Sequence, residues 1–324
     1  MLLKYFPART NLTFMKGRWP AFLLSALLII ASVALLATRG LNLGIDFAGG
    51  STIEIAQPED VSIDQVREAV SGLGLGDVNV TEAVGTGVDA EPVFVIRFKT
   101  QGEPGTEGAE TAQQAANDRV RAALEERFED LEVRGSAAVG PKVSGELLRA
   151  GVTALIAALV LMLVYIWFRF EWQFSIGAVA ALLHDVIITL GVFALVQLEF
   201  DLTTIAALLT IIGYSMNDTV VVFDRVREEM RKYKKMALEG VIDLALNGTL
   251  VRTILTSGTT LLALLAIFFL GGPVLRGMSF ALIFGVVIGT YSSIFIASSI
   301  LLTIGVTRER KPLDEDVPGF QGSP

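Results

Sequence analysis

Six apolar runs, each long enough to cross a lipid bilayer, constrain the fold of this chain more than any other feature. About 20 apolar residues span the hydrocarbon core as a helix, because each residue adds roughly 1.5 Å. The chain has 324 residues and is 52% hydrophobic, which is typical of a polytopic membrane protein. We therefore predict an α-helical protein with six transmembrane helices. Their approximate ranges are 20–39, 151–168, 173–196, 202–223, 252–271 and 278–304.

Basic residues between these runs predict the orientation. They gather before the first run, between the fourth and fifth runs, and after the last run. Positively charged loops stay in the cytoplasm. We therefore predict a cytoplasmic N-terminal tail (1–19), a cytoplasmic basic loop (224–251) and a cytoplasmic C-terminal tail (305–324). A cleaved signal peptide is the alternative for the first run, but its apolar part usually has only about 7–15 residues.

Residues 40–150 would then form a periplasmic domain. Alternating apolar residues predict four strands, and two helical patterns lie between them. Ser62 and Gln65 form a capping box at the start of the first helix. The order βαββαβ predicts a ferredoxin-like α+β domain. The acidic, Gly- and Pro-rich segment 102–110 is expected to be a mobile insertion. The expected strands are 51–56, 77–84, 92–99 and 131–139, and the expected helices are 62–70 and 112–128.

The basic loop 224–251 carries a second helical pattern after its cluster of bases. Apolar residues from Met236 to Leu246 fall broadly on one side of a helix, opposite Glu239 and Asp243. This pattern predicts an amphipathic helix that lies on the membrane surface before the fifth span.

An acidic residue lies inside the fourth run. Asp218 would cost about 2.5–3.5 kcal/mol in a bilayer, so it needs a partner, a proton or a function. Arg252 opens the fifth run at a similar expected depth and is the candidate partner. Asn217 and Tyr214 lie in the same run as Asp218 and are further relay candidates. Two alternatives stay open: a fixed structural ion pair, and an Arg252 that snorkels to lipid phosphates.

The third run contains a second pair of ionisable residues, His184 and Asp185. Neighbouring residues on a helix differ by about 100°, so the two cannot both face one partner. Both are candidates for a proton relay, because an intramembrane acid is usually functional and histidine titrates near neutrality. An interhelical hydrogen bond is the alternative for His184.

Two glycine motifs predict backbone geometry. Gly285 and Gly289 form a small-xxx-small pattern in the sixth run, which predicts close helix packing. The segment GIDFAGG after the first run is not a phosphate loop, because no helix follows and no lysine is suitably placed. We expect it to be a tight turn that joins the first helix to the domain. Its key residues are Gly44, Asp46, Phe47, Gly49 and Gly50.

The residue types exclude several kinds of function. The chain has no cysteine and one histidine, which excludes thiolate chemistry and multi-histidine metal sites. Its net charge of −8 gives no basic footprint for nucleic acid. We find no nucleophile–base set, metal cluster or nucleotide loop, so we expect no enzymatic activity and no cofactor.

Several motifs together resemble the SecF proteins of the SecD/SecF family of bacterial protein-export membrane proteins. The motifs cover nearly the whole chain except its tails and the 102–110 insertion. They are GIDFAGG after the first run, VGPKVSGEL before the second, HDV in the third, GYSMNDTVVVFDRVRE in the fourth, and NGTLVRTILTSGTTLLALLAIFFLGGPVLRG through the fifth.

The resemblance implies a fold, a location and a role. The fold is one half of an RND-type transporter in the bacterial inner membrane, and SecD supplies the matching half. The pair is implied to use the proton motive force to promote late translocation and release of preproteins at the periplasmic face. The implied neighbours are the SecYEG channel, YajC, YidC and membrane lipids. The ion-coupling residues of the family fall on Asp218 and Arg252, with H⁺ or Na⁺ as the coupling ion.

Two other functions remain to be weighed against this one. The chain could be a non-motor scaffold that stabilises SecD and the SecYEG channel. A small-molecule exporter is the third hypothesis, but a lone six-helix half with one domain of this size lacks the paired large domains of drug pumps.

Overall fold

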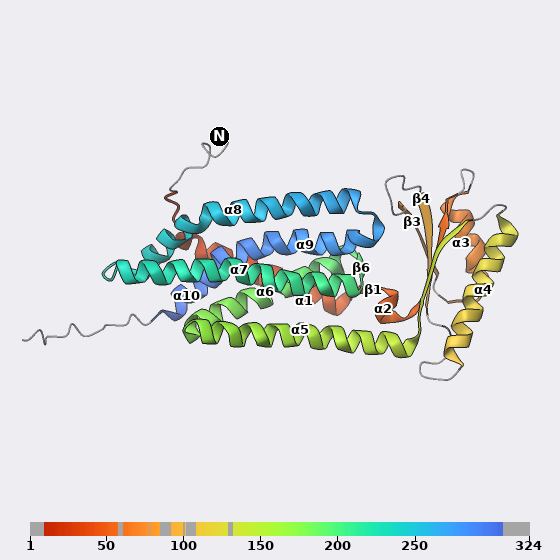
Figure 1. The fold of residues 1–324 in the computed structure, drawn as a ribbon, viewed down its shortest axis with the longest axis horizontal. Coiled ribbons are helices and arrows are strands. Elements are labelled where there is room, and N and C mark those ends of the chain that lie inside the picture. Colours follow the sequence, from red (N-terminus) through yellow and green to blue (C-terminus); the bar gives the residue numbers. More distant parts are fainter. Residues whose placement is uncertain are drawn as a thin grey trace, which may run out of the picture.

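A computed structural model of the chain describes residues 10–57, 61–76, 78–84, 92–99, 101, 108–128 and 132–306. Within these residues, six helical segments are long and apolar enough to cross a membrane, which confirms the predicted number of spans. They form an elongated bundle, and a separate α+β domain lies at one end of it (Figure 1). The spans are Phe14–Thr38, Lys142–Arg169, Trp172–Val196, Leu202–Lys232, Leu238–Leu270 and Leu275–Ile304.

Three helices form the interior of the bundle, and three lie around them. About half of the apolar window is buried in α6 (Trp172–Val196), α7 (Leu202–Lys232) and the last span. The last span consists of α9 (Pro273–Ser292), the π-helical segment η3 (Ser293–Ala297) and α10 (Ser298–Ile304). The outer helices expose most of their apolar side chains. They are α1 (Arg18–Thr38), which follows the short 3₁₀ turn η2 (Phe14–Gly17), α5 (Pro141–Arg169) and α8 (Leu238–Leu270).

The domain between α1 and α5 has the predicted order βαββαβ. Its four-stranded antiparallel sheet has the order β3-β4-β2-β5, which is the ferredoxin-like arrangement. The capping box of Ser62 and Gln65 is present at the start of α3. The elements are β2 (Gly50–Ala56), α3 (Ile63–Ser71), β3 (Val78–Val84), β4 (Pro92–Phe98), α4 (Ala109–Arg127) and β5 (Val133–Val139).

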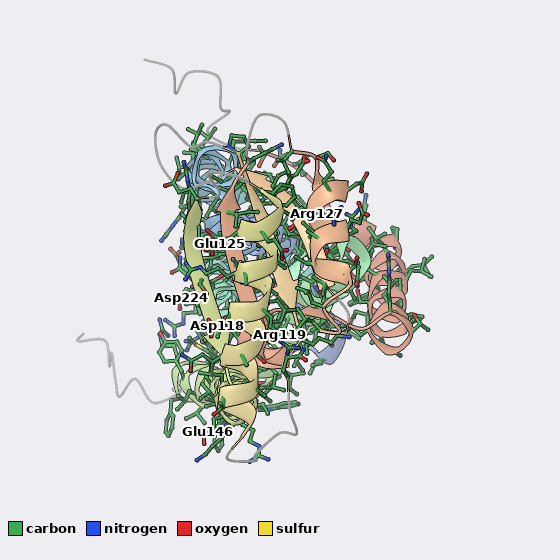
Figure 2. The ribbon with its side chains drawn as sticks, turned by 90° about the vertical axis from the view of Figure 1, so that its right-hand side faces the viewer. Asp118, Arg119, Glu125, Arg127, Glu146 and Asp224 are labelled. Carbon is green, nitrogen blue, oxygen red and sulfur yellow. The ribbon has the colours of Figure 1, made fainter. Side chains whose placement is uncertain are left out.

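The two helices cover the face of the sheet that points away from the bundle (Figure 1). Apolar side chains of the strands and helices form a core of their own there, with Phe94, Val66 and Val120 fully buried. The outer surface of α4 carries charged residues, including Asp118, Arg119 and Glu125 (Figure 2). Most of the expected insertion, residues 102–107, lies outside the described residues; residues 109–110 begin α4.

Three helices extend farther than the sequence predicts. Helix α5 begins at Pro141, directly after β5, so it continues from the domain into the bundle without a loop. At the other end, which we call the far end, α7 runs to Lys232 and α8 already begins at Leu238. Residues 224–251 therefore do not form one long loop, because α7 continues through most of the basic cluster and only residues 233–237 connect it to α8.

The separate amphipathic helix predicted around 236–246 is also wrong. These residues form the first turns of α8, and Ile242, Ala245 and Leu246 are buried in the same core as Met15 and α6. Asp243 accepts a hydrogen bond from the backbone N–H of Met15 at 2.9 Å. The apolar side of this segment thus packs on other parts of the protein. An apolar side that faces protein gives the same sequence pattern as one that faces a membrane surface.

Candidate functional site

Asp218 lies between three helices near the middle of α7. Its Oδ1 accepts a hydrogen bond from Thr253 Oγ1 of α8 at 2.7 Å, and its Oδ2 accepts one from Ser293 Oγ at 2.5 Å. Ser293 is the first residue of the π-helical segment η3. The side chain of Asp218 is partly buried. Two hydroxyl groups, and no base among the described residues, therefore hold this carboxylate.

The expected pair between Asp218 and Arg252 is not formed. The two residues lie at a similar depth, because α7 starts and α8 ends on the same side of the bundle (Figure 1). Asp218 is 16 residues, about 24 Å, from the start of α7, and Arg252 is 18 residues, about 27 Å, from the end of α8. However, consecutive helical residues differ by about 100°. Thr253 occupies the face of α8 that meets Asp218, and Arg252 is exposed on the outside of the bundle.

Of the other relay candidates in α7, Tyr214 lies near Asp218 and Asn217 does not take part. The Tyr214 hydroxyl donates to Ser257 Oγ at 3.2 Å, and Ser257 in turn contacts Thr290 Oγ1 at 2.7 Å. Asn217 is exposed on the surface of the bundle. Hydroxyl groups from α7, α8 and α9 thus continue from the Asp218 site along the bundle interior.

Asp185 and His184 form a second polar cluster in α6. Oδ2 of Asp185 accepts hydrogen bonds from Ser215 Oγ of α7 at 2.6 Å and from Ser292 Oγ of α9 at 2.8 Å. His184 bridges this acid to α1, because its Nδ1 lies 2.9 Å from Asp185 Oδ1 and its Nε2 lies 3.1 Å from Ser25 Oγ. Both ionisable side chains are buried.

The two acidic clusters meet at the contact between α7 and α9. Ser292 donates a hydrogen bond to Asp185, and the next residue, Ser293, donates one to Asp218. Gly289 leaves room for this arrangement, since a Cβ there would lie 3.1 Å from Ser215 Cβ and 3.6 Å from Asp185 Oδ2. One turn away, a Cβ at Gly285 would lie 2.3 Å from two side-chain atoms of Ile211. The backbones of α7 and α9 therefore approach closely where the acids are held.

Sequence reasoning missed the residues that hold the acids. The available signal was a set of hydroxyl residues inside apolar runs that also contain acids. The π-helical segment has no comparable signal in the sequence, and such segments are frequent at functional sites. The missed residues are Ser25, Ser215, Thr253, Ser292 and Ser293.

The GIDFAGG segment joins the domain to the bundle. It follows the short strand β1 (Asn42–Leu43), which pairs with β6 (Glu199–Phe200), and it forms the single turn α2 (Ile45–Ala48). Asp46 Oδ2 accepts a hydrogen bond from the backbone N–H of Leu202, the first residue of α7, at 3.1 Å. Phe47 is buried, and its ring centre lies 5.9 Å from that of Phe200. The predicted turn is thus also a docking element for the start of the helix that carries Asp218.

Two glycines of this segment need their special backbone freedom. Gly49 and Gly50 have φ values of 69° and 128°, which side chains disfavour. A Cβ on Gly50 would also lie 2.3 Å from the Phe98 carbonyl oxygen.

An ion pair crosses the same joint. Arg97 of β4 pairs with Glu199 of the α6–α7 connection. Burial raises the pKa of Glu199 above its ordinary value of 4.5, the Arg97 guanidinium opposes that rise, and the carboxylates of Asp201 and Asp46 add to it. Three acids and one base therefore cluster where the domain meets the first turn of α7.

The described residues contain no group of three or more His, Cys, Asp or Glu side chains that could hold a metal ion. What they do contain is a pair of acids held by hydroxyl groups within a membrane bundle. A six-span bundle, a ferredoxin-like domain and intramembrane acids define an integral membrane protein of the transporter type.

Comparison with known proteins assigns the family. The family described as "Protein export membrane protein SecD/SecF, C-terminal" matches residues 119–307, and the SecD/SecF GG motif matches residues 34–56. The chain therefore belongs to the SecD/SecF family, and this confirms the resemblance seen in its motifs. It is 47% identical to the protein translocase subunit SecF of Cereibacter sphaeroides, covering 94% of this chain and 93% of that protein. SecF of Rhodobacter capsulatus is 46% identical over 96% of this chain and 94% of its own.

Two solved structures of SecDF have the same fold. The SecDF of Thermus thermophilus matches with a TM-score of 0.79 and 32% identity, and SecDF in a super-membrane-facing form matches with 0.65 and 34%. Each match covers 92% of this chain but only 39% of the SecDF chain. The chain thus spans about two-fifths of these larger proteins. It is a protein-export subunit of the inner membrane.

Proposed function

We propose that this chain works with a SecD half to promote late translocation and release of polypeptides at the periplasmic face, driven by the proton motive force. The observation that carries the proposal is the placement of Asp218. A partly buried carboxylate at mid-bundle is held by two hydroxyl groups from different helices. The same helix, α7, begins at the joint with the domain, where Asp46 holds Leu202. A change at the acid can therefore reach the domain along one rigid helix.

Protonation of Asp218 is the proposed switch. The hydroxyl groups donate directly to the carboxylate at 2.7 and 2.5 Å, and loss of its negative charge would weaken both bonds. Thr253 faces Asp218, and a rotation of α8 by about 100° would bring Arg252 to that position. Two states of α8 would thus differ in which residue faces the acid. Sodium is the alternative coupling ion, and replacing sodium by choline in the assays below separates the two.

The available energy is sufficient for such a switch. One charge that crosses the membrane releases about 2.3 kcal/mol per 100 mV. That free energy shifts a two-state equilibrium about 50-fold, which is enough to reverse a modest preference between helix arrangements.

A SecD half is proposed to cover Arg252 and Asn217. Both residues are exposed, and a lipid-facing arginine at this depth costs about 2.5–3.5 kcal/mol. A polar partner surface would remove that cost. The matched Thermus thermophilus SecDF is described as a translocon-associated membrane protein, and we extend that association to this chain, with SecYEG, YajC and YidC as expected neighbours. In this arrangement both termini are cytoplasmic and the chain itself performs no chemical catalysis.

Export assays on Asp218→Asn test the proposal. The amide keeps the size of the side chain but cannot release a proton. In vesicles with SecD and SecYEG, we expect normal assembly and normal ATP-driven insertion, but loss of the stimulation by the proton motive force. Arg252→Lys, which removes the planar guanidinium, should behave similarly. Asp224→Asn is the matched control, because it makes the same change at a half-exposed position six residues farther along α7, where the carboxylate pairs with Arg169 and contacts neither acidic cluster.

Full force-dependent export by Asp218→Asn would contradict the coupling role. The chain would then be a scaffold for SecD and the channel.

A further inference from the structure

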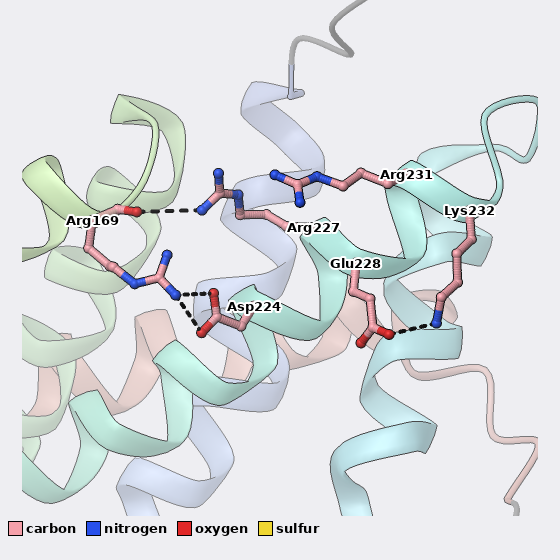
Figure 3. Close-up of a pocket in the computed structure, with 6 residues that line it drawn as sticks. All are labelled: Arg169, Asp224, Arg227, Glu228, Arg231 and Lys232. Carbon is pink, nitrogen blue, oxygen red and sulfur yellow. Dashed lines mark hydrogen bonds and ion pairs between the residues drawn. The ribbon is translucent and has the colours of Figure 1, made fainter.

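An open pocket lies at the far end of the bundle, away from both acidic clusters. It has a volume of about 520 Å³ and lies between the end of α5 and the last turns of α7. Figure 3 shows the six side chains around it, four basic and two acidic. They are Arg169, Asp224, Arg227, Glu228, Arg231 and Lys232.

Two of the four bases are already neutralised. Arg169 Nη2 donates to both carboxylate oxygens of Asp224 at 2.9 and 3.0 Å. Lys232 Nζ donates to Glu228 Oε1 at 2.6 Å. Glu228 Oε2 also accepts from Arg225 Nη1 at 2.7 Å, and Arg225 in turn pairs with Glu229, also at 2.7 Å. Both acids that line the pocket are therefore paired, and the net charge of +2 of the six lining side chains resides on the two remaining arginines.

Arg227 and Arg231 have no carboxylate partner within the part of the chain that the structure describes. Arg227 Nη1 reaches only the backbone carbonyl of Arg169 at 3.4 Å, and its guanidinium lies 5.5 Å from the centre of the Phe170 ring. The arginines are four residues apart, so they lie on the same side of α7, and both extend beside the pocket in Figure 3. Like charges at this spacing destabilise a helix. An anion between them would remove that repulsion.

Exposed aromatic side chains place the pocket at the level of lipid headgroups. Trp167 and Phe168, directly before Arg169, are 63% and 85% exposed, and Trp172 at the start of α6 is 55% exposed. Exposed tryptophan at the ends of spanning helices marks the boundary between membrane and water. Farther from the end of α5, toward the middle of the bundle, the exposed apolar side chains include Leu161 and Val164, along which acyl chains could lie.

From this arrangement we infer that the pocket binds the phosphate group of an anionic phospholipid. Arg227 and Arg231 supply the charge and the planar donors that suit a phosphate. The neighbouring apolar surface of α5 favours a lipid over a free phosphate ion. The inference does not depend on ion coupling, because neither acidic cluster takes part.

Native mass spectrometry of the full-length chain in detergent tests the site. The chain is titrated with phosphatidylglycerol, with phosphatidylcholine of the same acyl chains, and with inorganic phosphate. We expect R227Q/R231Q to bind phosphatidylglycerol about 30-fold more weakly than the wild type, which corresponds to about 1 kcal/mol for each arginine. K16Q/K235Q removes two exposed charges from the same end and should bind like the wild type.

Two results would overturn the inference. One is an equal loss of affinity in both double variants, which would mean that general charge attracts the lipid. The other is displacement of phosphatidylglycerol by inorganic phosphate, which would assign the pocket to a soluble anion.

A second measurement does not depend on the folding of a variant at the pocket. Trp19→Phe leaves Trp167 and Trp172 as the only tryptophans of the chain. In bilayers of equal composition, brominated phosphatidylglycerol should quench their fluorescence more strongly than brominated phosphatidylcholine. Equal quenching by the two lipids would contradict the inference.

Discussion

The close contact of α7 and α9 can be tested by adding one carbon atom at Gly285. A Cβ there would lie 2.3 Å from Cδ1 and Cγ1 of Ile211 and 2.9 Å from its Cγ2, so Gly285→Ala forces the helices or Ile211 to move. Overpacking of this kind costs about 1–3 kcal/mol. Replacing glycine by alanine also stabilises the helix itself by about 1 kcal/mol. Since three atoms of one residue are contacted, we expect the upper part of the range and a net destabilisation of about 2 kcal/mol.

Gly213→Ala is the matched control for this change. Gly213 is also in the middle of a spanning helix, but a Cβ there would contact nothing within 4 Å. It should therefore stabilise the protein by about 1 kcal/mol. Combining Gly285→Ala with Ile211→Ala removes the atoms that would clash, so the cost of Gly285→Ala should vanish in that background. The coupling energy should be about 2–3 kcal/mol.

Thermal unfolding in one detergent, followed by tryptophan fluorescence, measures these differences. A change of 1 kcal/mol moves the midpoint by about 2 °C for a chain of this size. The reasoning is refuted if Gly285→Ala raises the midpoint as much as Gly213→Ala does, or if Ile211→Ala leaves the cost unchanged.

Three further predictions concern the joint, the second cluster and the orientation. Burial raises the pKa of Glu199, so this group contributes its full stabilisation below about pH 4.5 and loses it as the pH rises through the raised pKa. Glu199→Gln should therefore flatten the decrease of the thermal midpoint above pH 4.5. An unchanged slope in this variant would contradict the role given to Glu199. His184→Ala removes two buried contacts, to Asp185 and Ser25, and should lower the free energy of unfolding by about 2–3 kcal/mol. If thermal unfolding shows a loss below about 0.5 kcal/mol, these contacts are not formed. Cysteines introduced at Glu125 and Lys235 should react with an impermeant thiol reagent from opposite sides of the membrane, and reaction from one side would refute the six-span orientation.

Local patterns made the domain and the spans predictable. The alternation in Gly50–Ala56 and the capping box at Ser62 depend on neighbours in sequence, and both are found where expected. The start of α8 was missed because an apolar side facing a membrane and one facing Met15 and α6 look the same in sequence.

The candidate site was only partly predictable for a related reason. An acid inside an apolar run identifies Asp218 without any structure. Its partner depends on how α8 is turned about its own axis, because the neighbouring residues Arg252 and Thr253 point about 100° apart. The spacing of residues in the sequence does not determine that orientation. The π-helical turn that positions Ser293 is an irregularity of the backbone with no signature in residue type. The contact between GIDFAGG and the start of α7 joins segments about 150 residues apart and likewise has no local signal.

The central claim is that Asp218 carries the coupling ion, and proton flux tests it most directly. The chain is reconstituted with SecD in liposomes that contain a pH-sensitive dye, and a pH gradient and membrane potential are imposed. The account predicts proton entry with the wild-type chain and with Asp224→Asn, and none above the protein-free rate with Asp218→Asn, although that variant still binds SecD. Proton entry at the wild-type rate with Asp218→Asn would contradict it.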